Sequence, residues 1–412
     1  MKTSLHPRFE NLPEAARAET ILRSCVHCGF CTSGCPTYQL LGDENDSPRG
    51  RIALIKEMFE VGEVKEAHST HLDRCLTCRS CETHCPSGVA YTELLDIAKG
   101  IMADTHARSL RSRLSRGVLR RILSAQGLLK TGFKALRTLR SLKWLIRWLP
   151  VGIPWIPKIK QATHKTEAFS QTVVILEGCV QQAATPSVNE ALRALLASQA
   201  IATISIQGEA CCGAMNYHLG EHDQGRQDMR RLLHQVRDQV PQGALIVSTA
   251  SGCGVTLKDY AKFFSPSDPD YALAIEISGR VIDVVEILQR YTWNVEPRRI
   301  AVHTPCTLSH GQGLGEAAKQ LLLGAGFELT VGAPASLACC GSAGTYSVLQ
   351  PALSKQLRDQ MVAGLERDAP EVIVTANVGC HLHLAAGSSI PVMHWVELLC
   401  QQSQQQEPRR QQ

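Results

Sequence analysis

Short apolar runs alternate with helix-like segments in the C-terminal part of the chain. Runs rich in β-branched residues, typical of buried strands, lie at 173–176, 245–247, 300–302 and 372–374. Between them, segments such as 189–198 and 316–324 carry apolar residues every three or four positions, which predicts helices. Strands that alternate with helices indicate a layered α/β fold with parallel sheets.

The N-terminal part shows helical periodicity. Segments 51–61 and 91–102 are its clearest predicted helices, and 42–50 has the polar, acidic composition of a turn. Together with the C-terminal pattern, this predicts an α+β fold class overall, with a helical domain followed by an α/β layered region.

An internal repeat of cysteines runs through the α/β region, and each copy contains a Cys-Cys-Gly triplet. Equivalent cysteines are 127, 128 and 127 residues apart, which indicates a duplication. Because ligands gather beyond the carboxyl ends of parallel strands, each copy could bring its four thiols to one sheet edge. The first copy has Cys179, Cys211, Cys212 and Cys253, and the second has Cys306, Cys339, Cys340 and Cys380.

Composition and charge divide the 412 residues further, as expected for a chain too long for one ordinary domain. Residues 105–166 contain 15 Lys and Arg and no Asp or Glu, although the whole chain carries a net charge of only +5. We therefore expect five segments: an N-terminal domain at 1–104, basic amphipathic helices or a linker at 105–166, a first Cys-Cys-Gly module at 167–295, a second at 296–400, and a frayed glutamine-rich tail at 401–412.

The chain has seventeen cysteines and no recognisable export signal. No apolar run reaches the roughly 18 residues of a transmembrane helix. A cytoplasmic location is therefore expected, where cysteines indicate metal or redox chemistry rather than a disulfide framework.

Two motifs of four cysteines followed by proline carry the strongest chemical signal. Their spacing, C-x2-C-x2-C-x3-C-P, is that of bacterial ferredoxins with two [4Fe–4S] clusters, in which the fourth cysteine ligates the other cluster. Structural zinc also takes four thiolates, but its sites usually pair two C-x2-C knuckles. The predicted ligands are Cys25, Cys28, Cys31 and Cys85 for cluster 1, and Cys75, Cys78, Cys81 and Cys35 for cluster 2. The N-terminal domain is thus predicted to be a helical, ferredoxin-like domain.

The Cys-Cys-Gly modules are a second, less specific signal. Adjacent cysteines do not easily form a relaxed disulfide with each other. Paired thiols usually face a metal cluster or act in redox exchange, although buried cysteines can also serve simply as small apolar residues. The eight module cysteines are therefore candidates for additional metal or redox sites, and His303, His381 and His383 stand near them in sequence.

The basic segment has the pattern of an interfacial amphipathic helix. Leucines and other apolar residues from Leu129 to Leu149 recur at helical spacing beside Lys and Arg, and Trp144, Trp148 and Trp155 follow the same stretch. Binding to an anionic membrane surface is one interpretation. Docking on partner subunits and a solvated basic face are the alternatives, and nucleic-acid binding is not expected.

No flavin or nicotinamide site is expected on this chain. The glycines at 311, 313 and 315 lack the G-x-G-x-x-G spacing of a dinucleotide site and indicate a helix start instead. Since iron–sulfur clusters move single electrons, a two-electron oxidation would need a flavin on another subunit.

The chain resembles the iron–sulfur subunits of bacterial glycolate oxidase over nearly its full length. The features on which this resemblance rests are the two ferredoxin-type motifs, the two Cys-Cys-Gly modules and the segments 47–52, 71–78, 176–179 and 340–346. The resemblance implies an electron-transfer subunit of an acceptor-dependent glycolate dehydrogenase, with no catalytic residue of its own. FAD-binding partner subunits would oxidise glycolate to glyoxylate, and electrons would pass to membrane quinone at the cytoplasmic face of the inner membrane.

The modules themselves resemble those of heterodisulfide reductases, whose extended motif has five cysteines. Here Ala250 and Asn377 stand where that motif has another cysteine, so cluster binding in the modules remains open. Three alternatives also remain: the same role in lactate or glycerol-3-phosphate oxidation, a heterodisulfide-reductase-like thiol–disulfide enzyme, and a zinc-stabilised scaffold.

Overall fold

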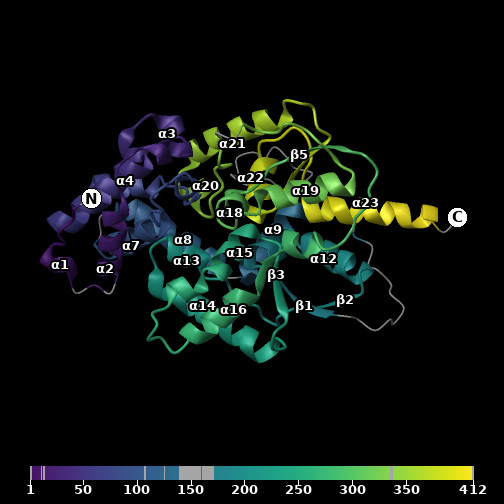
Figure 1. Cartoon of the computed structure of the whole chain (residues 1–412), viewed down its shortest axis with the longest axis horizontal. Helices are drawn as coiled ribbons and strands as arrows, with labels where there is room; N and C mark the ends of the chain where they lie inside the picture. The colour runs from purple at the N-terminus through teal and green to yellow at the C-terminus, as the bar shows by residue number, and fades with distance from the viewer. Residues whose placement is uncertain are drawn as a thin grey trace.

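The computed structural model describes residues 2–10, 12, 14–105, 108–124, 126–138, 159, 171–334 and 337–410. A helical N-terminal part leads into two α/β modules that pack against each other (Figure 1). The described part of 2–105 is helical, with α1 (Pro7–Glu10), α2 (Ala15–Ser24), η1 (Phe30–Thr32), α3 (Pro36–Leu41), η2 (Glu44–Asp46), α4 (Pro48–Val61), α5 (Glu66–Asp73), α6 (Ser80–Thr83) and α7 (Tyr91–Asp104).

Local sequence signals explain the central helix of this part, α4. Ser47 caps it, because its Oγ accepts a hydrogen bond from Gly50 N at 3.0 Å, and Pro48 opens its first turn. Gly62 ends it in the left-handed region at φ 79°. The predicted turn at 42–50 is therefore shorter than expected, since α4 already begins at Pro48.

Each module contains a four-stranded parallel sheet, and the two sheets have the same strand order. In the first module the order is β2-β1-β3-β4, and in the second it is β6-β5-β7-β8. The strands are β1 (Gln171–Leu176), β2 (Ile201–Ile204), β3 (Leu245–Ser248), β4 (Val281–Asp283), β5 (Arg299–Val302), β6 (Glu328–Leu329), β7 (Val372–Thr375) and β8 (Val392–His394). The equivalent topology confirms the duplication and the α/β interpretation.

Helices surround both sheets. In the first module they are α11 (Cys179–Ala184), α12 (Ser187–Ser198), α13 (Ala214–His218), α14 (His222–Gln239), α15 (Ser251–Lys258), η4 (Tyr260–Phe263), α16 (Tyr271–Arg280) and α17 (Val284–Leu288). In the second they are α18 (Cys306–Ser309), α19 (Gly315–Ala325), α20 (Tyr346–Leu349), α21 (Pro351–Glu366), α22 (Val378–Ala385) and α23 (Trp395–Arg410). The four predicted strands and four predicted helices are all present, and α19 does begin at Gly315.

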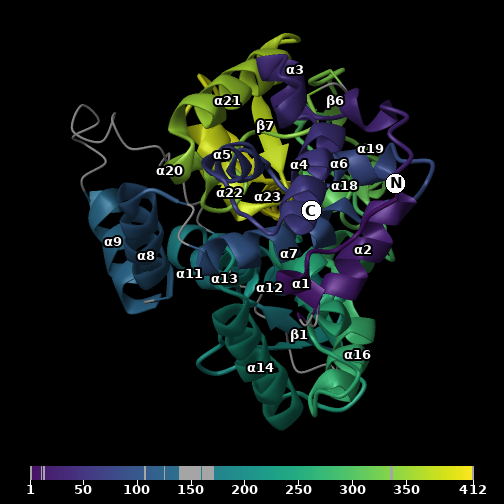
Figure 2. The same ribbon diagram turned by 90° about the vertical axis from the view of Figure 1, so that its left-hand side faces the viewer.

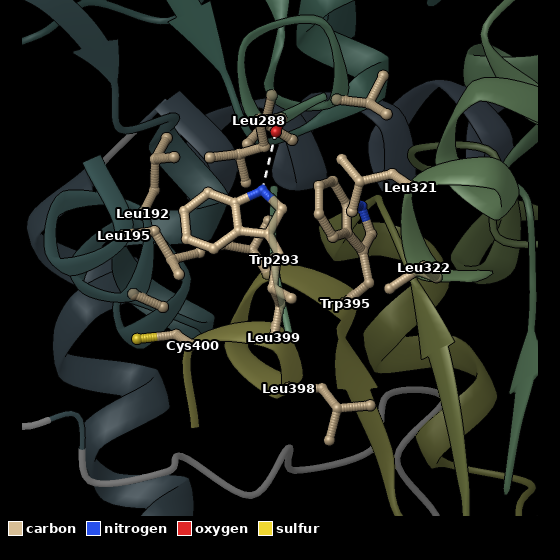
Figure 3. Close-up of a cluster of buried hydrophobic side chains, with 14 of the residues drawn as sticks. Leu192, Leu195, Leu288, Trp293, Leu321, Leu322, Trp395, Leu398, Leu399 and Cys400 are labelled. Atoms are coloured by element: carbon tan, nitrogen blue, oxygen red, sulfur yellow. Dashed lines mark hydrogen bonds between the residues drawn. The ribbon is translucent and has the colours of Figure 1, made fainter. Parts of the chain in front are cut away.

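One hydrophobic core joins the two modules. It contains Leu192 and Leu195 of the first module together with Leu322 and Trp395 of the second. Trp293 lies at its centre and donates a hydrogen bond from Nε1 to Leu288 O at 2.8 Å (Figure 3). The shared core fixes the sheets relative to each other, so their carboxyl ends can face a common region.

The C-terminal helix α23 also contributes to this core. Cys400, which has no counterpart in the repeat, is 1% exposed there and packs with apolar neighbours (Figure 3). We expected a frayed tail from residue 401 onward, but α23 continues to Arg410.

Part of the basic segment forms a pair of helices, α8 (Leu110–Ser124) and α9 (Gln126–Thr138), which lie side by side at one side of the molecule (Figure 2). Leu129 is buried and Lys130 is exposed, as the amphipathic pattern predicts. The three tryptophans and the apolar positions from 139 to 149 lie outside the described residues. Among the described residues, no helix is long and apolar enough to cross a membrane.

Candidate metal centres

The two ferredoxin-type motifs bring their cysteines together in crossed groups. Set 1 lines one cavity and consists of Cys25, Cys28, Cys31 and Cys85. Set 2 lines a second cavity and consists of Cys35, Cys75, Cys78 and Cys81. The two cavities are adjacent, because Cys81 borders both of them. The fourth cysteine of each motif thus lies with the first three of the other motif.

The backbone around the two sets repeats the same unusual conformation. His27 and Gly29 follow Cys25 with positive φ angles of 57° and 87°. Thr77 and Arg79 hold the equivalent places after Cys75, with φ angles of 51° and 61°. Three of these four are not glycine, and such left-handed residues are uncommon outside functional sites. Left-handed residues placed between others turn successive backbone N–H groups inward, which makes a concavity suited to an anionic group.

Burial of the thiols shows what kind of group the cavities fit. Burial, followed by the charges of Cys339 and Cys75, raises the pKa of Cys78 well above its ordinary value. Burial and Cys25 raise the pKa of Cys31 to about 11. A thiol whose pKa burial raises in this way becomes a thiolate only beside a strong positive charge, such as metal ions provide.

A buried arginine stands beside set 2. Arg51 is 1% exposed, and its Nη1 lies 3.9 Å from Cys35 Sγ. It donates hydrogen bonds to Thr37 Oγ1 at 3.0 Å and to His71 O at 2.8 Å, and it forms an ion pair with Asp46 at 3.2 Å. Burial opposes its charge, yet its pKa is raised because thiols and Asp46 surround it. A fixed positive charge therefore accompanies set 2.

The sequence pattern did not identify Arg51 as part of the site. A signal was present, because Arg51 occupies an apolar face of α4 with Ile55 and Met58, which are both fully buried. A charged residue on a buried helix face is almost always paired with a buried group of opposite charge.

The first module gathers its four cysteines beyond the carboxyl ends of its strands. Cys179 begins α11, and its Sγ lies 3.8 Å from Cys211 Sγ. Cys212 lies in hydrogen-bonding range of both Cys211 and Cys253, and Tyr260 Oη donates to Cys212 O at 2.9 Å. The expected grouping of these thiols is therefore present in the structure.

The second module gathers its cysteines in the same way. Cys306 is within hydrogen-bonding range of Cys339, and Cys340 is within range of Cys339 and Cys380. Unlike the first module, this one adds a histidine, since His303 lies beside Cys340 and Cys380. Burial lowers the pKa of His303 to about 4, so its ring is neutral and able to ligate a metal.

The other histidines flagged by the sequence do not belong to this group. His381 Nε2 contacts Val392 O at 2.9 Å, and His383 Nε2 contacts Ser354 Oγ at 3.0 Å. Neither is among the residues grouped around the module thiols.

Set 2 lies close to the thiols of the second module. Cys78 and Cys339 belong to one small buried cluster, which also contains Tyr346. Near this cluster, the second ferredoxin-type motif contacts both modules. Arg79 forms an ion pair with Asp259 of the first module at 2.7 Å, and Thr83 Oγ1 lies 3.0 Å from His310 Nδ1 of the second module.

The two modules also touch next to their thiols. Asn377 Oδ1 accepts a hydrogen bond from Gly252 N at 3.3 Å, and Asn377 Nδ2 lies 3.5 Å from Cys380 Sγ. Asn377, which replaces a cysteine of the longer motif, therefore connects the cysteine helices of both modules.

The chain is 40% identical to the glycolate oxidase iron–sulfur subunit of Escherichia coli (strain K12), over 97% of this chain and 98% of that protein. It belongs to the family of glycolate oxidase iron–sulfur subunits. A probable glycolate oxidase iron–sulfur subunit of Bacillus subtilis (strain 168) is 29% identical over 89% of each chain. Lactate utilization protein A of Bacillus velezensis is 26% identical over 47% of this chain and 84% of that protein.

Two family models agree with this assignment. A 4Fe-4S dicluster domain matches residues 21–89, which contain both ferredoxin-type motifs. A cysteine-rich domain matches residues 173–258 and again 300–385. The chain is thus an iron–sulfur, electron-transfer component of an oxidoreductase complex, with a ferredoxin-type region and a duplicated Cys-Cys-Gly region.

Proposed function

We propose that this chain carries electrons, one at a time, from FAD-binding subunits that oxidise glycolate to glyoxylate toward a membrane quinone. In this proposal set 1 and set 2 each hold a [4Fe–4S] cluster. The observation that carries the proposal is the pair of adjacent cavities, one lined by the four cysteines of set 1 and the other by the four of set 2, in the crossed arrangement of two-cluster ferredoxins. When bound, such clusters supply reversible single-electron transfer, and the protein's residues hold and tune them.

Exposure of set 1 favours it as the point of electron entry. Cys28 is exposed, and its neighbours Val26 and Phe30 are 68% and 64% exposed. Exposed apolar side chains around an electron-carrying thiol suit the docking of a flavin-bearing partner. Set 2 lies deeper, since Cys35, Cys78 and Cys81 are buried.

Helix α8 supports the peripheral membrane association in the proposal. Leu110, Leu114, Val118 and Ile122 repeat every four residues and are all exposed, so they form one apolar stripe. The first three of them line an open cavity that Asn216, Gln224, Asp228 and Arg231 border on its other side. Arg113 and Arg121 lie on the same helix and attract anionic lipid. Not all the basic charge is available, because Arg116 pairs with Asp73 at 2.8 Å and Arg120 pairs with Glu221 at 2.7 Å.

The proposal is tested with Cys78→Ala in the assembled complex. Loss of a set 2 ligand should lower the iron content and stop acceptor reduction, while glycolate still reduces the flavin. Cys400→Ala is the matched control, because Cys400 is also buried but lies in the shared core of the modules. Normal acceptor reduction in Cys78→Ala, or equal loss in Cys400→Ala, would contradict the proposed role.

Two other functions make different predictions. If the modules were a thiol–disulfide enzyme, the purified chain would reduce a disulfide with an artificial electron donor, and we expect no such turnover. A role in lactate oxidation, suggested by the match to lactate utilization proteins, would require the complex to reduce its flavin with lactate in preference to glycolate.

A further inference from the structure

One buried histidine distinguishes the second module from the first. His303 lies three residues before Cys306, and Leu176 holds the equivalent place before Cys179. The side chain is 4% exposed, and its backbone N donates to Val374 O at 2.8 Å in the neighbouring strand. The sheet therefore fixes the position of this ring beside the module's thiols.

The ring has the surroundings of a metal ligand. A ring nitrogen of His303 and the sulfurs of Cys340 and Cys380 all lie within 4.8 Å of one another. His303 Nδ1 lies 2.9 Å from Thr375 Oγ1. Metal-ligating histidines usually make such a bond through the ring nitrogen that does not bind the metal, because it fixes the tautomer and the ring orientation.

The donor set is larger than a single zinc ion requires. Cys306 and Cys339 continue the chain of neighbouring sulfurs that includes Cys340 and Cys380, so four thiols and one imidazole face one region. Structural zinc is almost always bound by four ligands. Five donors beside a ferredoxin-type site instead suit a centre that contains several iron atoms.

We propose that His303 ligates an iron–sulfur centre in the second module, together with the thiols of Cys306, Cys339, Cys340 and Cys380. The inference rests on the proposed function and adds to it the next electron carrier after set 2. Cys78 of set 2 shares a buried cluster with Cys339, so the two sites are neighbours. The step between them is the movement of one electron, and no bond forms or breaks.

Histidine ligation also gives this step a direction. A neutral imidazole contributes one negative charge less than a thiolate, and replacement of cysteine by histidine raises the reduction potential of iron–sulfur centres. The centre in the second module therefore accepts electrons from set 2, whereas the first module has Leu176 in place of the histidine.

The test uses the full chain, purified without oxygen after growth on ¹⁵N-labelled histidine. Pulsed EPR of the reduced protein should show coupling to a directly bound ¹⁵N nucleus, and iron should exceed the roughly eight atoms of two [4Fe–4S] clusters. In His303→Ala the nitrogen coupling and the additional iron should disappear, while the ferredoxin-type signals remain. His381→Ala is the control, since this equally buried histidine of the same module bonds to Val392 O.

A second variant separates loss of a ligand from loss of folding. His303→Cys should keep the additional iron, lose the nitrogen coupling and move the potential of this centre downward. An unchanged potential in His303→Cys, unchanged iron in His303→Ala, or zinc in place of the additional iron would overturn the inference. Absence of the eight ferredoxin-type iron atoms from the unaltered chain would instead overturn the proposed function.

Discussion

Cys78 and Cys339 lie in one small buried cluster, although they come from opposite ends of the chain. Burial is the largest cause of the raised pKa of Cys78, and the charge of Cys339 is the second largest. The second ferredoxin-type motif is therefore docked directly on the thiols of the second module. An ion pair between Arg79 and Asp259 fixes the same loop to the first module.

Arg51→Met should destabilise the N-terminal part and lower the reduction potential of the set 2 cluster. Removing one partner of a buried ion pair costs about 3–5 kcal/mol, here by leaving Asp46 less well compensated. Loss of the positive charge 3.9 Å from Cys35 Sγ also disfavours the reduced cluster. Denaturant unfolding and a redox titration followed by EPR measure the two effects.

Arg49→Met is the matched control for this variant. Arg49 is on the same helix, but its ion pair with Glu44 is exposed, so solvent screens it and its loss should cost little stability. If both variants lost equal stability and left the set 2 potential unchanged, the role assigned to Arg51 would be wrong.

Glu397 should make the packing of the two modules sensitive to pH. It is fully buried, and burial raises its pKa to about 7, although Ser187 Oγ and His394 N both donate to it. The folded protein then binds more protons than the unfolded chain between about pH 4.5 and 7, so stability falls as pH rises through this window. The loss approaches about 3 kcal/mol, since each pKa unit corresponds to about 1.36 kcal/mol.

Thermal unfolding at pH 5, 6, 7 and 8 measures this effect. Glu397→Gln should flatten the fall in Tm between pH 5 and 7, whereas Glu371→Gln, at an exposed ion pair with Arg298, should leave the slope unchanged. The same slope in Glu397→Gln and in the unaltered chain would show that another group causes the dependence.

Leu114→Glu should weaken binding to vesicles that contain anionic lipid. Leu114 is 71% exposed in the apolar stripe of α8, and burying a leucine side chain contributes about 1.5–3 kcal/mol, or roughly tenfold in affinity or more. Vesicle sedimentation gives the affinity. Ile275→Glu, on the exposed side of α16, is the control and should bind normally. Equal binding by the unaltered chain and both variants would favour the alternative in which α8 is simply a solvated basic face.

The sequence predicted the fold through features that act locally. The β-branched runs end within one residue of the strand ends, and the repeat of the cysteines at offsets of 127 and 128 residues predicted the duplication that the two equivalent sheets confirm. The spacing of Cys25 to Cys35 and of Cys75 to Cys85 predicted the crossed grouping now seen around the two cavities.

Contacts between distant segments could not be predicted in this way. No local pattern indicates that Cys78 will meet Cys339, or that one core around Trp293 will join both modules. His303 was recognised only as a neighbour of Cys306 in sequence, because its approach to Cys340 and Cys380 depends on how β5 and β7 pair.

The central claim is that set 1 and set 2 hold two iron–sulfur clusters that carry single electrons. It is tested most directly by iron, sulfide and zinc analysis of the full chain purified without oxygen, combined with low-temperature EPR of the same sample. The account predicts at least about eight iron and eight sulfide atoms per chain and the EPR signals of reduced [4Fe–4S] clusters. A colourless protein that contains zinc and no sulfide would contradict it.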